Sequence, residues 1–232
     1  MTRPRFELED DSAAARGVSR ARVAAGGGAP PGSASDRGGG GGGEPASSGP
    51  PVSTLAIGMS VLLGSLTMLF VGVIGAYVVL RFGAPEWPPA GAPEMPKGLY
   101  GSTAVILLSS VVLERARRAI RRGDARALES GIVATTVLGL AFLGLQAYFW
   151  SGLFASGLTL ESDIYGALFY TLTGLHAAHV LGGIVLLVVV AARAVLGKYT
   201  REAHGAVGAC AAYWHFLGAV WVVLFLMLVV FP

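Results

Sequence analysis

Five long apolar stretches separated by polar segments make up the sequence from residue 52 onward, at about 52–80, 98–113, 131–150, 163–192 and 206–231. Most of them reach the roughly 20 residues that a helix needs to cross the hydrocarbon core of a membrane. The second is short, but small and apolar residues among the arginines that follow it indicate that the helix continues past Leu113 while the arginines snorkel. The pattern predicts an all-α fold, a polytopic membrane bundle of five transmembrane helices.

The first 51 residues follow a different pattern. They combine glycine runs, proline pairs and charges of both signs with few large apolar side chains. Such a composition offers little surface to bury and is typical of disordered segments. We therefore expect a disordered cytoplasmic tail over 1–51 and one transmembrane domain over 52–232.

Composition and charge sharpen this interpretation. Hydrophobic residues make up 53% of the chain and charged residues only 13%, whereas a soluble domain carries roughly 25% charge. Basic residues gather after the second and fourth stretches, and by the positive-inside rule this predicts a cytoplasmic N-terminus and an external C-terminus. The basic isoelectric point thus reflects membrane topology, and no nucleic-acid partner is expected. Cys210 is the single cysteine, which excludes a disulfide within the chain.

Three histidines lie inside the last two stretches. His176 and His179 share one helix face with Thr173, and His215 lies in the fifth stretch. One interpretation is a haem or metal site built from imidazoles on facing helices. The other is a set of neutral histidines that hydrogen-bond between helices. The second is favoured because a pair three residues apart crowds a single metal, and because no carboxylate in the apolar interiors would orient the ligands.

The other polar side chains within the apolar stretches are uncharged. Ser65 in the first, several hydroxyls in the second and Gln146 in the third are each expected to bond a neighbouring helix. The apolar interiors contain no Asp, Glu, Lys or Arg, and a proton pump or ion-coupled carrier normally places an ionisable group at depth. The sequence therefore predicts neither transport chemistry nor a metal or catalytic site.

Two motifs in the last stretches carry a family resemblance. The fourth contains Thr173-Gly-Leu-His176-Ala-Ala-His179-Val-Leu-Gly-Gly183, and the fifth contains Tyr213-Trp-His-Phe216 followed by Trp221. Together they resemble the haem–copper oxidase subunit III family, that is, cytochrome c oxidase subunit III. The similarity extends over about 52–231 and matches the short bacterial form with five helices.

This chain departs from the family pattern at four positions that are usually acidic. They are occupied here by Leu66, Phe149, Gly208 and Gly218. The resemblance therefore extends to the scaffold and not to a proton-linked role of this chain.

The resemblance implies a non-catalytic subunit of the inner (plasma) membrane that supports the stability of an aerobic electron-transport complex. Members of this family bind no haem or copper, pack against subunit I (with subunit II in the same complex) and hold lipids; the haem and copper belong to the partner subunits. Two alternatives remain open: an accessory protein of a nitric oxide reductase, and a haem-binding electron carrier that uses His176 or His179 with His215. The residues expected to serve helix packing, lipid contact or partner contact are Ser65, Gln146, Thr173, His176, His179, Tyr213, Trp214 and His215.

Overall fold

The computed structural model describes residues 54–231, so the tail predicted over 1–51 lies outside the described residues. Within this part of the chain all regular structure is helical, which confirms the predicted all-α membrane bundle. The helices are α1 (Thr54–Gly83), α2 (Gly98–Arg121), α3 (Ala125–Ala155), α4 (Ile164–Val195) and α5 (Gly205–Phe225), and α5 continues into a π-helical turn, η1 (Leu226–Val230).

All five helices are long enough to cross a bilayer. The candidate spans contain 30, 24, 31, 32 and 26 residues, which corresponds to about 36–48 Å against a hydrocarbon core of about 30 Å. Helix α2 continues to Arg121, as the sequence predicts, and buries Ala116, Ala119 and Ile120 on its inner face. The chain is therefore a multi-pass membrane protein.

Short polar segments fix where the helices begin and end. The Asp124 carboxylate accepts a hydrogen bond from the Ala127 amide at 2.9 Å and caps α3. Asp163 does the same for α4 by accepting a hydrogen bond from the Gly166 amide at 2.7 Å. Gly123 has a φ of +87°, a conformation that favours glycine, and it reverses the chain between α2 and α3.

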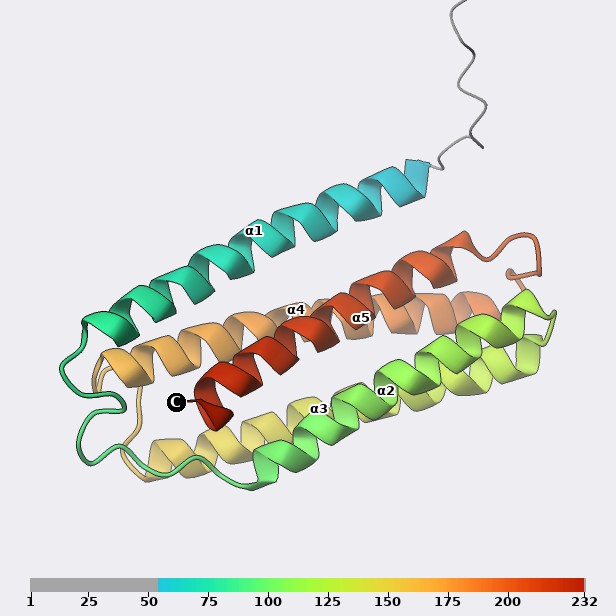
Figure 1. Ribbon diagram of the computed structural model, residues 1–232. Helices are drawn as coiled ribbons and strands as arrows, with labels where there is room; N and C mark the ends of the chain where they lie inside the picture. Colours follow the sequence, from blue (N-terminus) through green and yellow to red (C-terminus); the bar gives the residue numbers. More distant parts are fainter. Residues whose placement is uncertain (1–53, 232) are drawn as a thin grey trace, which may run out of the picture. The chain divides into compact units, whose positions relative to one another are not determined.

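Four of the helices pack in a closed sequence of neighbours. Helix α2 lies along α3, α3 along α4 and α4 along α5, while α5 returns to contact α2 (Figure 1). Helix α1 contacts α5 and, over a shorter stretch, α4. It buries only Leu66, Phe70 and Tyr77 and leaves its other apolar side chains exposed, which suits a helix with most of its surface facing lipid or a partner.

The Trp214 indole occupies the place where α3, α4 and α5 come together. A Cβ added to Gly139 of α3 would lie 2.6 Å from the Trp214 Cη2, and one added to Gly183 of α4 would lie 3.0 Å from its Cε3. Backbone on both sides therefore contacts the ring closely, as small residues allow between membrane helices. These two glycines make room for the largest fully buried side chain of the described residues.

Because of this contact, replacing glycine by alanine should change the stability of the bundle differently at two positions of α3. Gly139→Ala should destabilise the bundle by about 1–3 kcal/mol because the added methyl group overlaps the indole. Gly144→Ala, with no atom within 4 Å of the added Cβ, should be neutral or stabilising because alanine favours helix by about 1 kcal/mol over glycine. Thermal unfolding in mild detergent measures both variants, and equal midpoints would contradict the predicted overlap.

Candidate functional site: polar side chains between the helices

Two indole N–H groups of α5 donate to hydroxyl groups of α2. Trp214 Nε1 donates to Ser109 Oγ at 2.9 Å, and Trp221 Nε1 donates to Thr103 Oγ1 at 3.0 Å. The tryptophans are seven residues apart and so lie on one face of α5. Each hydroxyl also donates to a carbonyl of its own helix. All these groups are buried and paired, which fixes the position of α5 along α2.

Tyr213 and His179 connect α5 with α4. The Tyr213 hydroxyl donates to the His179 backbone carbonyl at 3.1 Å. The His179 ring turns back on its own helix, with Nδ1 2.7 Å from the Leu175 carbonyl oxygen. A carbonyl only accepts, so this nitrogen carries the proton. The connection between the helices is therefore made by the tyrosine hydroxyl and the histidine backbone, and the imidazole bonds within α4.

His176 lies in a cage of aromatic rings. Its side chain is 1% exposed, and neither ring nitrogen has a hydrogen-bond partner among residues 54–231. The ring centroid lies 6.3 Å from that of Phe70 on α1, 6.2 Å from Phe142 on α3 and 5.3 Å from Trp221 on α5. A charge without a counter-charge would be very costly here, so the imidazole packs as a neutral aromatic ring where four helices meet.

The expectation that the histidines hydrogen-bond between helices is wrong for His176, which has no partner among the described residues, and for His179, whose ring bonds its own helix. Thr173, one turn before His176 on the same helix, is buried but donates to the Phe169 carbonyl at 2.7 Å instead. A threonine within a helix reaches the carbonyl four residues back more easily than a side chain on its own face. Thr173 thus bonds its own helix.

His215 faces an acid, contrary to the expectation that no carboxylate accompanies the imidazoles. Its Nε2 lies 3.7 Å from Oε2 of Glu114 on α2, beyond hydrogen-bond distance. Glu114 is held by Arg117 at 2.7 Å and by Arg118 at 2.9 Å. The side chains are 37% and 22% exposed. The sequence predicts that the second helix continues past Leu113, but it does not predict that α5 crosses beside the charged last turns of this helix.

Gln146 is buried between the helices, whereas Ser65 lies on the exposed surface of α1. Gln146 is buried, and its Nε2 has no hydrogen-bond partner in the described part of the chain. Together with Thr173 and Trp221 it lines a cavity of about 10 Å³. Ser65 is exposed on α1 and donates to the Val61 carbonyl of its own helix at 3.0 Å, so the predicted bond to a neighbouring helix is wrong for this residue.

The structure packs α4 against α5, and it brings to them residues that the two motifs do not identify. Phe70 and Phe142 complete the cage around His176, and an aromatic residue in an apolar stretch gives no signal of such a role. Glu114 was detectable as the single acid among the arginines of α2. No group of three or more His, Cys, Asp or Glu side chains is placed to hold a metal ion anywhere in 54–231.

Comparison with known proteins matches this sequence to one family. A family model described as cytochrome c oxidase subunit III matches residues 49–232. The chain is 36% identical over 172 residues to cytochrome c oxidase subunit 3 of Synechocystis sp., covering 73% of this chain and 72% of that protein. It is 32% identical over 173 residues to the same subunit of Thermostichus vulcanus, covering 74% and 85%.

A third relative, the probable cytochrome c oxidase subunit 3 of Mycobacterium leprae, is 33% identical over 172 residues, covering 74% of this chain and 85% of that protein. The family match includes all five helices and both motifs on which the resemblance rests. The chain belongs to the cytochrome c oxidase subunit III family.

Proposed function

We propose that this chain is a non-catalytic subunit of a haem–copper terminal oxidase, in which it packs against subunit I and stabilises the complex. The observation that supports this most directly is the use of its histidines. His176 is enclosed by aromatic rings, His179 bonds its own helix, and His215 lies beside a carboxylate that two arginines already hold. The imidazoles of His176 and His179 are therefore not open as redox ligands would be, and His215 faces a carboxylate.

The haem and the copper then belong to partner subunits, and oxygen is reduced there. A bis-histidine haem would need His215 and an imidazole of α4 to face one another. His176 instead contacts Phe70, Phe142 and Trp221, while His215 lies beside Glu114 of α2. The relatives are cytochrome c oxidase subunits, which favours an oxygen reductase over a nitric oxide reductase as the complex that this chain joins.

The buried polar pairs explain how such a subunit keeps its shape without a cofactor. Trp214 and Trp221 join α5 to α2, and Tyr213 joins α5 to α4. The outer surfaces of α1 to α4 carry many exposed large apolar side chains. These surfaces are available both to lipids and to subunit I.

Purification of the complex tests the proposed partner. A tagged chain purified in mild detergent from aerobically grown cells should retain a haem–copper subunit I and its haem absorption. The isolated chain, expressed with ample haem, should show no Soret band. Purification without subunit I under every respiratory condition, or a Soret band in the isolated chain, would contradict the proposal.

Cysteine labelling tests the proposed orientation in the inner (plasma) membrane. The α2–α3 and α4–α5 connections and the start of α1 should be cytoplasmic because the basic residues gather at that end. In a Cys210→Ala background, Glu161→Cys should react with a membrane-impermeant maleimide in intact spheroplasts. Thr200→Cys should react only after lysis. Both variants should label in permeabilised cells, and the reverse pattern in spheroplasts would place the C-terminus inside.

A further inference from the structure

Gln146 of α3 carries the only side-chain amide of this protein, because the sequence contains no other glutamine and no asparagine. The residue is 3% exposed, and its Nε2 makes no hydrogen bond to any residue among 54–231. The nitrogen of a side-chain amide carries two N–H donors, which water satisfies in an unfolded chain. Buried polar groups of native proteins almost always have a partner, so this nitrogen indicates that a bound molecule supplies one.

The ring contacts between α3 and α4 show which residue lies opposite Gln146. The two helices are neighbours that run in opposite directions. Two pairs of rings join them, each with the centroids 6.2 Å apart: Phe142 with His176, and Trp150 with Tyr170. Gln146 lies midway between the two aromatic residues of α3, and Thr173 lies midway between their partners on α4. The amide and the threonine are therefore at the same level of the bundle.

Gln146 and Thr173 line one small cavity of about 10 Å³. This volume is room for about one water molecule. The Thr173 hydroxyl donates its proton to the Phe169 carbonyl at 2.7 Å, so its oxygen remains free to accept a hydrogen bond. Trp221 also lines the cavity, but its N–H donates to Thr103. The cavity thus combines a free donor on α3 with a free acceptor on α4, and its other side chains are apolar.

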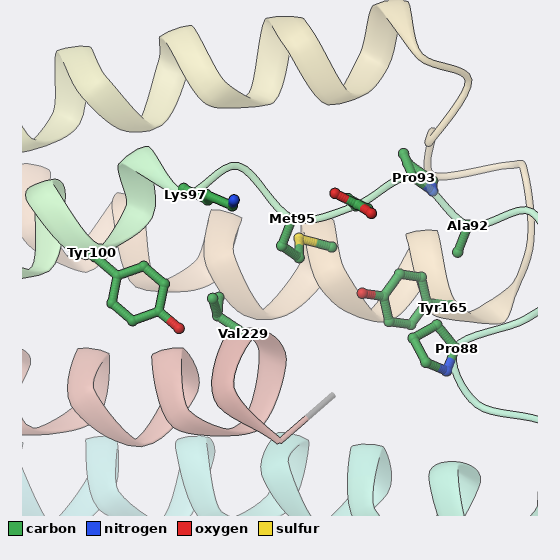
Figure 2. Close-up of a pocket in the computed structure, with 9 residues that line it drawn as sticks. Pro88, Ala92, Pro93, Met95, Lys97, Tyr100, Tyr165 and Val229 are labelled. Carbon is green, nitrogen blue, oxygen red and sulfur yellow. The ribbon is translucent and has the colours of Figure 1, made fainter.

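An open hollow beside this cavity gives water a route to it. The hollow has a volume of about 750 Å³ and lies where α2 and α4 begin and η1 ends, and the α1–α2 connection forms much of its wall (Figure 2). Val229 of η1 lines both the hollow and the cavity, and it is the one described residue that the two linings share. A movement of this side chain would connect the two spaces.

We propose that the cavity binds one water molecule, which accepts a hydrogen bond from Gln146 Nε2 and donates one to Thr173 Oγ1. A cavity remains dry where its whole lining is apolar, and this lining is not. The water joins α3 to α4 nearly as well as a direct hydrogen bond would. The predicted bond from Gln146 to a neighbouring helix then runs through this water. The inference does not depend on the proposed oxidase partner, because every group that it uses belongs to this chain.

NMR spectroscopy of the full chain in nanodiscs tests this proposal. If glutamine labelled with ¹⁵N at its side-chain nitrogen is supplied, Gln146 is the sole source of side-chain amide signals. The wild type should show a cross-peak between these amide protons and water, with the sign of a bound water molecule. A rotating-frame experiment distinguishes this cross-peak from direct proton exchange. An amide signal without such a cross-peak in the wild type would overturn the proposal.

Thr173→Val removes the acceptor and nearly keeps the side-chain volume. It should reduce the water cross-peak about fivefold, because the water loses one of its two hydrogen bonds. Thr135→Val is the matched control, since Thr135 is buried, donates to a carbonyl of its own helix at 2.8 Å and does not line the cavity. This control should keep the cross-peak of the wild type. An undiminished cross-peak in Thr173→Val, or an equal loss in both variants, would overturn the proposal.

Discussion

A membrane interior supplies no hydrogen bonds, and this constraint determines how the bundle uses its polar side chains. The tryptophans of α5 each carry one N–H group that must find an acceptor. Trp214 and Trp221 find theirs on Ser109 and Thr103 of α2, at 2.9 and 3.0 Å. Because the indoles are large and buried, the bonds hold extensive apolar contacts in register. The glycines of α3 and α4 that contact Trp214 then let the other helices close around it.

His176 shows the other solution to the same constraint. It has no hydrogen-bond partner among the described residues, and it lies among rings from α1, α3 and α5. The imidazole is therefore part of the packed interior rather than an open ligand. Glu114 and His215 lie together only where α2 has left its apolar stretch and arginines compensate the acid. Charged side chains therefore come together near the end of α2, whereas the polar side chains of the bundle interior are neutral.

The sequence predicted the five helices and the continuation of the second one past Leu113, because the hydrophobic length of a helix depends on neighbouring residues alone. It did not predict the contact between Glu114 and His215, since a single helix does not show which neighbour its charged last turns will meet. Ser65 and Thr173 bond their own helices, a choice that depends on local geometry. The hydrophobic pattern of one helix does not show which other helices will pack against it. The rings around His176 come from three different helices, α1, α3 and α5.

The central claim is that the indole–hydroxyl pairs join α5 to α2. A double-mutant cycle with Trp214→Phe, Ser109→Ala and the double variant measures this directly, by reversible unfolding in detergent. Both changes keep most of the side-chain volume, so the coupling reports the hydrogen bond. We expect a coupling free energy of about 0.6–2 kcal/mol. Fully additive effects of the two substitutions would contradict the account.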